Sequence, residues 1–224
     1  MSYDFAIVRP ADLCALGLTP PVDDAAIARF YDDDYEKAAA PRSLVEFTEA
    51  LLERVPFGDE NETTDENHWL MVDPGAYRTM AQVAASWDFV PQALATILEL
   101  TFDRGLAVLD PQSRILFDPT DSIWVQVTTD GAMSSPYLSR GLLDQFVNLA
   151  AAKNGFIVIS EEDEYVYAQT RYTDGTFEVE HRGGEDAHFA STTTDAALVA
   201  EILWSWVSDG EEWRTALPWH RIRV

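Results

Sequence analysis

The sequence predicts an α+β fold made of two small domains, each with helices packed on a short, mostly antiparallel sheet. Of the 224 residues, 47% are hydrophobic, which is enough for a packed core. Segments in which apolar residues recur at helical spacing are separated by short runs that alternate or are wholly apolar. The pair Asp174-Gly175 lies between two alternating segments, which is typical of an antiparallel hairpin.

The chain is expected to divide near its middle. We assign residues 1–130 to an acidic α+β domain, and residues 135–224 to a helix–strand–hairpin–helix domain with a Trp-rich C-terminus. Gly, Ser and Pro gather in residues 129–137, a composition that is typical of a linker. A single compact domain remains an alternative, because the second half alone would have only a small core.

The first half begins with an alternating strand over residues 3–8 that ends at Pro10. Helices follow at about residues 24–40, after a cap at Asp23-Asp24, and at about residues 41–55. The apolar residues 69–72 predict a buried strand. The next segment predicts a helix from about Ala76, interrupted near Pro91 and continuing to Phe102; its first apolar face comprises Met80, Val83, Ala84 and Trp87. Strands are expected at residues 106–109, 114–117 and 122–128.

The second half predicts a helix over residues 138–153 that ends at Asn154-Gly155, followed by a strand over residues 156–159. Two strands, 165–172 and 177–182, flank the hairpin turn at Asp174-Gly175. A third strand is expected at residues 188–191, and Asp195 caps a final helix. The tail from residue 213 is expected to fold back over that helix.

The charge of the chain excludes several classes of partner. There are 39 acidic and 15 basic side chains, for a formal net charge of -24. Such a surface repels nucleic-acid phosphates, so no nucleic-acid binding is expected. No apolar run reaches the length of a membrane span, and residues 1–4 do not resemble a secretory signal. The lone Cys14, which we expect to be buried beside Leu13 and Leu16, fits a reducing cytoplasm.

One acidic stretch is the first candidate for a partner surface. Between Gly58 and Trp69 no apolar residue occurs, and five carboxylates with no base among them are Asp59, Glu60, Glu62, Asp65 and Glu66. Such a run contributes little to folding, so we expect an exposed loop. It is interpreted as the electrostatic part of a surface that binds a cationic protein, and a mere spacer is the alternative.

A cluster of tryptophans near the C-terminus is the second candidate. Trp204, Trp206, Trp213 and Trp219 lie close together in the sequence, and Trp is enriched at binding hot spots. Core packing is the alternative. Trp204 and Trp206 lie about 200° apart around a helix, so they face different sides. With Trp206 directed inward, Trp204 is the residue expected to contact a partner.

The search for catalytic patterns gives neither a catalytic nor a metal-binding motif. The sequence lacks phosphate-binding loops, Cys-x-x-Cys pairs, His-Glu-x-x-His and nucleophile elbows. His181 and His188, on either side of Gly183-Gly184, are residue types that suit zinc, but strand alternation places the nearby Glu178 and Glu180 on the face opposite His181. The acidic run at residues 161–164 is better read as a solvated turn than as a calcium loop. We therefore expect no catalytic residue, no metal and no cofactor.

Two segments resemble known groups of proteins. Residues 2–8 resemble the start of uncharacterised bacterial α+β proteins. The segment from Tyr167 through Asp174-Gly175 and His188-Phe189 to Trp213 and Pro218-Trp219 resembles small immunity-type modules of bacterial toxin systems. The resemblance implies a hairpin-plus-helix unit that binds a partner protein, and it carries no catalytic signature.

The sequence therefore favours a non-enzymatic, acidic binding protein of the cytoplasm. Its expected partner is a cationic protein, as for an immunity-like inhibitor of a toxin or for an acidic mimic that occupies a nucleic-acid site. Opposite charges on the two partners would accelerate their encounter. The alternatives are an acidic protein whose charge only keeps it dispersed, and a small metal-dependent enzyme that uses loop carboxylates.

Overall fold

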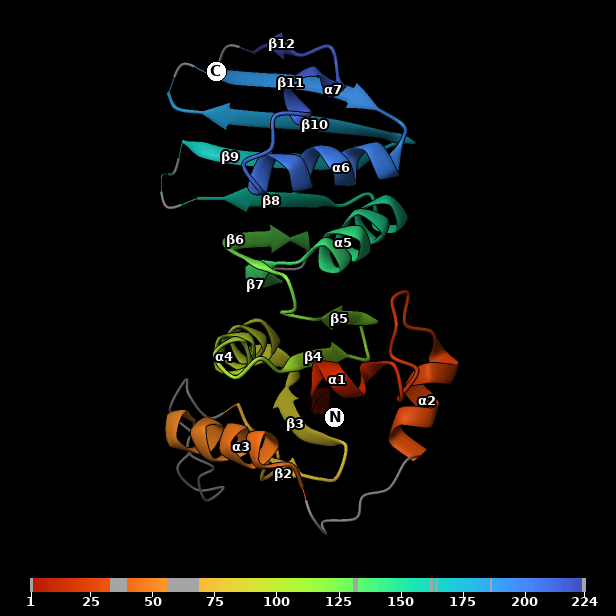
Figure 1. Cartoon of the computed structure of the whole chain (residues 1–224), viewed down its shortest axis with the longest axis vertical. Helices are drawn as coiled ribbons and strands as arrows, with labels where there is room; N and C mark the ends of the chain where they lie inside the picture. The colour runs from red at the N-terminus through yellow and green to blue at the C-terminus, as the bar shows by residue number, and fades with distance from the viewer. Residues whose placement is uncertain are drawn as a thin grey trace. The chain divides into compact units, whose positions relative to one another are not determined.

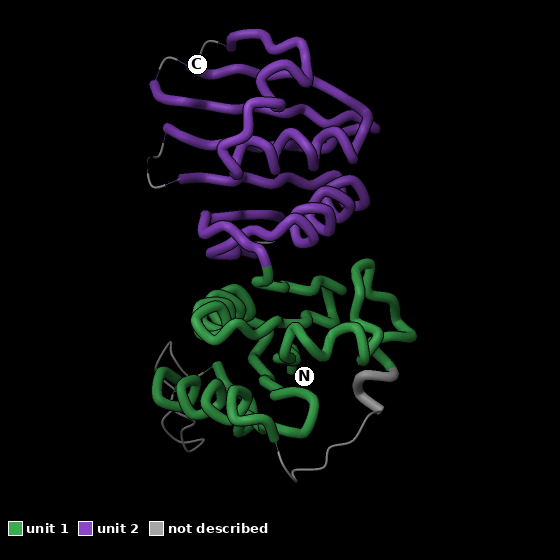
Figure 2. Tube along the Cα trace, viewed as in Figure 1, with its two compact units in different colours: residues 1–120 green, residues 121–224 purple. Residues whose placement is uncertain are grey.

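The computed structural model describes residues 2–32, 40–55, 69–130, 133–161, 163, 165–185 and 187–222 (Figure 1). Within these ranges the chain is α+β, with seven α-helices and two antiparallel sheets of five and seven strands. The fold class predicted from the sequence is confirmed. The chain divides into two compact units, residues Met1–Thr120 and residues Asp121–Val224 (Figure 2).

The first unit is built on a five-stranded sheet. Its order is β2-β3-β1-β4-β5, with antiparallel pairing throughout. The strands are β1 (Ser2–Val8), β2 (Gly75–Ala76), β3 (Met80–Ser86), β4 (Ala107–Asp110) and β5 (Ile115–Phe117). The central strand β1 is buried on both faces, since the adjacent side chains of Phe5 and Ala6 are both fully inaccessible. The sheet therefore has core on each side.

The helices of this unit are α1 (Pro10–Leu13), α2 (Asp24–Asp32), α3 (Arg42–Arg54) and α4 (Val90–Phe102), with the 3-10 turn η1 (Trp87–Phe89) before α4. Helices α3 and α4 contact each other and β3. An ion pair of 2.6 Å between Arg54 and Glu99 also joins them. Leu13 of α1 and Ala26 of α2 belong to a different core cluster with Ala6 and Val8 of β1. The predicted cap is present, because Asp23 accepts a hydrogen bond from the Ala26 amide.

Three local predictions for the first unit are wrong. The segment expected to be a helix from Ala76 forms β2 and β3 instead, and Trp87 is 50% exposed. The strand expected at residues 69–72 is reduced to one bridge between Leu70 and Ala85. Cys14, expected to be buried, is exposed, because the short helix α1 directs Leu13 inward and the next residue outward.

A buried hydrogen bond joins the neighbouring strands β1 and β4 of the first sheet. The Tyr3 hydroxyl donates to the Asp110 carboxylate at 2.7 Å, and the amides of Gln112 and Ser113 donate to the other Asp110 oxygen. Burial of the ring, and then the negative charge of Asp110, raise the pKa of Tyr3 above its ordinary value. The hydroxyl therefore stays protonated and remains a donor.

Tyr3→Phe is expected to lower the free energy of unfolding by about 1–2 kcal/mol, because one buried oxygen of Asp110 loses its donor. Chemical denaturation followed by circular dichroism measures this change. Tyr172→Phe is the matched control, with an expected change within about 0.5 kcal/mol, since the Tyr172 hydroxyl has no hydrogen bond among the described residues. Equal losses in the two variants would contradict the assignment.

The second unit is built on a seven-stranded antiparallel sheet with the order β12-β11-β10-β9-β8-β6-β7. Its strands are β6 (Ile123–Thr129), β7 (Ser134–Leu138), β8 (Phe156–Ser160), β9 (Val166–Thr173), β10 (Thr176–Gly183), β11 (His188–Thr193) and β12 (His220–Arg221). The segment 129–137, expected to be a linker, contains the last residue of β6 and most of β7. The division between the two units falls earlier, after Thr120.

Local sequence signals define the rest of this unit. Its helices are α5 (Arg140–Lys153), α6 (Ala196–Val207) and α7 (Trp213–Ala216). Asn154, in a left-handed conformation with φ 53°, ends α5 as predicted, and Asp195 caps α6 through the amides of Ala197 and Leu198. The predicted hairpin is present, with Asp174 and Gly175 both at positive φ between β9 and β10.

Helices α5 and α6 cover one face of the second sheet (Figure 1). The side chains of Phe177 and Val179 point toward these helices and are buried. Alternate positions point the other way, where Trp124 of β6 is 62% exposed and Phe156 of β8 is 38% exposed. Among the described residues, no helix combines the length and apolar composition needed to cross a membrane.

Candidate functional site

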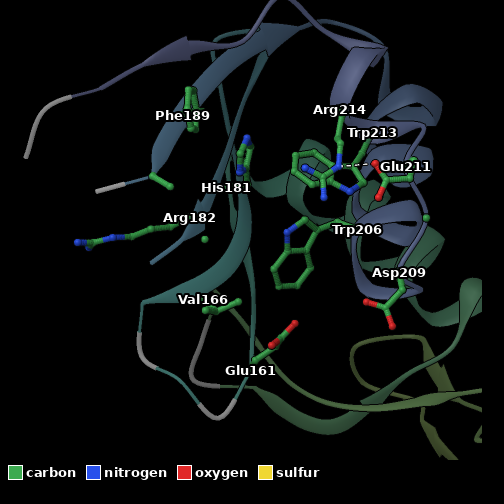
Figure 3. A pocket seen from close by; sticks show the side chains of 13 residues that line it. Glu161, Val166, His181, Arg182, Phe189, Trp206, Asp209, Glu211, Trp213 and Arg214 are labelled. Carbon is green, nitrogen blue, oxygen red and sulfur yellow. Dashed lines mark ion pairs between the residues drawn. The ribbon is translucent and has the colours of Figure 1, made fainter. Parts of the chain in front are cut away.

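A hollow of about 410 Å³ opens on the helix-covered side of the second unit, at the C-terminal end of α6 (Figure 3). Its walls come from β10, β11, α7 and the turn between α6 and α7. The lining residues are Glu161, Val166, His181, Arg182, Gly183, Ala187, Phe189, Trp206, Asp209, Gly210, Glu211, Trp213 and Arg214. The hollow thus combines aromatic rings with carboxylates.

The aromatic part is centred on His181. Its imidazole stacks on Phe189, with a centroid distance of 5.2 Å and an interplanar angle of 15°. The indoles of Trp213 and Trp219 approach it edge to face at 4.5 and 4.8 Å. The Trp219 indole N–H donates to the Trp213 carbonyl oxygen, so the two residues are also joined directly. Four side chains from β10, β11, α7 and the tail therefore form one packed cluster, here called the histidine cluster.

The histidine cluster alters the acidity of the imidazole at its centre. Burial lowers the pKa of His181 to about 4, and electrostatic interactions with His188 and Arg214 act in the same direction. His181 is consequently neutral at neutral pH. It adds no positive charge to the hollow, and its basicity is too low for a general base near pH 7.

The turn between α6 and α7 sets the position of Trp213. Asp209 has a left-handed φ of 56°, and the Gly210 amide donates to the Ser205 carbonyl oxygen at 2.7 Å. A β-carbon on Gly210 would lie 2.6 Å from the Ser205 hydroxyl oxygen, which explains glycine there. The Ser205 hydroxyl donates to Glu212. Backbone donors, and then this hydroxyl, lower the pKa of that carboxyl.

Two arginines near the hollow are engaged within the chain. The Arg214 guanidinium lies 4.9 Å from the centre of the Trp213 ring and pairs with Glu211 at 2.6 Å. Arg182 extends away from the hollow (Figure 3). It donates to the carbonyl oxygens of Gly184 and Glu185. The other charged groups of the lining are the carboxylates of Glu161 and Asp209, so the hollow is suited to a positively charged ligand.

A separate polar cluster lies on the other face of the sheet. The His188 Nε2 atom is 3.0 Å from the Glu180 carboxylate and 3.3 Å from the Tyr167 hydroxyl. Gln169 donates to the same carboxylate oxygen at 2.7 Å. The zinc pair considered above is therefore not formed, because the register pairs His181 with Phe189 and places His188 on the opposite face. The described ranges contain no group of three residues able to hold a metal ion.

The candidate residues chosen from the sequence lie elsewhere. Trp204 is half-buried and lines a smaller hollow of about 290 Å³ between α6 and α7, together with Ser208 and Glu212. Asp59, Glu60, Glu62, Asp65 and Glu66 lie outside the described residues. Sequence reasoning missed His181, Trp206 and Asp209 as parts of one site. The signal that pointed toward it was the tryptophan cluster, since three of its four members line this hollow or its histidine cluster.

Comparison of the chain with protein-family models, with curated proteins and with solved structures gives no match. The chemistry of the hollow is therefore the basis for the function proposed below.

Proposed function

We propose that the chain is a non-enzymatic binding protein for a cationic protein partner. The observation that supports this most directly is the hollow of the second unit, where aromatic rings and carboxylates surround a space near a neutral histidine. The unit that contains the hollow also favours a cationic ligand, since residues 121–224 hold 17 acidic and 7 basic side chains, a net charge of -10. A basic protein surface complements both features.

Two kinds of cationic partner fit this proposal. An immunity-like inhibitor neutralises a cationic toxin by covering its basic surface, and a nucleic-acid mimic occupies a site built for phosphates. Both need a strongly acidic surface, which the net charge of -24 supplies. A lone free cysteine, Cys14, suits action in a reducing cytoplasm. The two sequence-based alternatives are a dispersed acidic protein and a metal-dependent enzyme. Neither predicts that a basic protein binds the chain saturably.

Capture from an extract of the source organism tests the proposal. The immobilised chain is exposed to the extract at low and at high salt, and each retained protein is identified, purified and tested for one-to-one binding. We expect a basic partner whose association rate falls by about tenfold or more between the two salt conditions. A partner without net positive charge, or association that salt leaves unchanged, would overturn the proposal.

The acidic stretch between Gly58 and Trp69 gives a second test with the purified partner. Replacing Asp59, Glu60, Glu62, Asp65 and Glu66 by their amides is expected to slow association about tenfold at low salt and to leave dissociation nearly unchanged. The physical reason is the loss of long-range attraction, which fades once salt shortens the Debye length below ~8 Å. Stopped-flow association rates measure the effect. An unchanged association rate at low salt would show that these five carboxylates do not attract the partner.

A further inference from the structure

We propose that the hollow beside α6 receives the side chain of an arginine from the partner, which stacks on the indole of Trp206 and pairs with Asp209. This inference rests on the proposed function and specifies the chemical group that the site recognises. Three features of the hollow carry it. Among the residues that the structure describes, one indole has no ring partner and two carboxylates have no ion pair. In addition, an arginine of the chain itself already uses the same chemistry.

Among the aromatic residues that line the hollow, Trp206 is the one without a ring contact in the described part of the chain. It lies at the end of α6, is half-buried, and projects its indole into the hollow (Figure 3). Trp213 and Trp219 are engaged in the histidine cluster, whereas Trp206 has neither a ring contact nor a hydrogen bond within the described part of the chain. An indole face at such a position is the preferred aromatic surface for a cation.

Two carboxylates accompany this indole. Glu161 and Asp209 both line the hollow, and Figure 3 shows their carboxylate groups lower in the view than the Trp206 ring, with Asp209 to one side. Neither forms an ion pair among the residues that the structure describes, in contrast to Glu211, which pairs with Arg214. A cation over Trp206 would therefore meet negative charge that the fold itself leaves uncompensated.

Arg214 shows which cation suits this kind of site. Its guanidinium lies over Trp213 and pairs with Glu211 through Nε, so one arginine of the chain already combines an indole face with a carboxylate. The Trp206 side of the hollow offers the same two elements to a second guanidinium. A planar guanidinium stacks on an indole and hydrogen-bonds a carboxylate at once, whereas a lysine ammonium is a compact, strongly hydrated charge. His181 is neutral at neutral pH and therefore adds no repulsion to an approaching cation.

The experiment is a titration of the full-length chain with N-acetylarginine amide, followed by the indole N–H resonances. The Trp206 resonance is assigned with Trp206→Phe. We expect it to move saturably with the arginine probe, to move less with N-acetyllysine amide, and to stay in place with the neutral citrulline analogue. A shift of equal size with citrulline, or no saturable shift with arginine, would overturn the inference.

A pair of matched substitutions tests the carboxylate. Asp209→Asn removes one charge at the hollow, and Asp174→Asn removes one charge at the hairpin turn at the other end of β10. Both residues are exposed, with φ of 56° and 50°, a conformation that Asn tolerates, so both variants should fold. We expect the arginine probe to bind about three- to tenfold more weakly to the first variant and unchanged to the second.

A second pair tests the indole and separates this inference from the proposed function. Trp206→Leu is expected to abolish the response to arginine, whereas Trp204→Leu on the same helix leaves it intact, as read from the remaining indole and backbone resonances. If the extract yields no basic protein partner although the arginine probe still binds, the proposed function alone is refuted. Partner binding with full affinity to both Trp206→Leu and Asp209→Asn would refute the arginine site and leave the proposed function standing.

Discussion

Trp213→Ala is expected to lower the free energy of unfolding of residues 121–224 by about 2–4 kcal/mol, somewhat below the ~3–5 kcal/mol for truncating a fully buried aromatic side chain, because Trp213 is half-buried. Trp213 contacts the His181 ring edge to face and lies against Trp219, and the Arg214 guanidinium lies over its ring. Alanine removes all three contacts at once. None of the four residues of the short helix α7 is buried, so apart from its contacts with α6 the helix depends on the Trp213 side chain.

Denaturation followed by circular dichroism, together with hydrogen exchange of the β10 and β11 amides, measures this loss. Trp124→Ala is the matched control, because it removes the same side chain from the same unit, on β6 of the sheet, at a site that is 62% exposed. We expect that control to change stability by less than about 1 kcal/mol. If the two variants lose equal stability, the histidine cluster does not hold α7 in place.

Elements with strong local signals were predicted well from the sequence. The hairpin of β9 and β10 follows from strict alternation around Asp174-Gly175, whose two residues adopt the positive φ that such a turn requires. Helix α6 follows from its Asp195 cap and its apolar periodicity. In these cases the local preference and the tertiary environment demand the same structure, so one sequence suffices to find them.

Strand β3 shows why other elements were missed. Met80, Val83, Ala84 and Trp87 recur at helical spacing, which predicted a helix. In the structure β3 lies inside the sheet, and residues such as Met80, Ala81 and Val83 are fully buried on both of its faces. A strand with core on both sides has no polar alternation, so its pattern resembles that of a buried helix. Only the pairing with β1, which is distant in sequence, distinguishes them.

The site was missed because its residues are gathered by strand register and by a turn. The register sets His181 opposite Phe189 and sends His188 to the other face, and a shift of one residue would exchange these positions. Gly210 then folds α7 back so that Trp213 reaches His181. The tryptophans were visible in the sequence as candidates for binding, but the choice between Trp204 and Trp206 depended on this geometry.

Lowering the pH from about 6.5 to about 4 is expected to destabilise the second unit through His181. The pKa of this imidazole is lowered to about 4 in the folded chain, chiefly by burial, whereas an unfolded chain has an ordinary value near 6.5. Between these limits the unfolded state binds a proton that the folded state excludes. The contribution of His181 to stability is thus fully present above about pH 6.5 and decreases as the pH falls toward 4.

The size of this effect follows from the shift after allowance for solvent. A fully buried group with such a shift would contribute about 3 kcal/mol, and the half-exposed position of the ring reduces this to about 1–2 kcal/mol. Many carboxylates also titrate toward the lower end of the range. The measured quantity is therefore the difference in unfolding free energy between the wild type and His181→Phe, in which the contributions of groups common to both cancel.

Denaturation curves of the two proteins at constant ionic strength, between pH 7.5 and 4, give this difference at each pH. The wild type is expected to lose about 1–2 kcal/mol more than His181→Phe across the window, with most of the loss below pH 6.5. Ring-proton resonances of His181 in the folded wild type supply the direct measurement of its pKa. Parallel curves for the two proteins, together with an ordinary pKa for the His181 ring, would show that the surrounding aromatic residues do not shield this histidine from protonation.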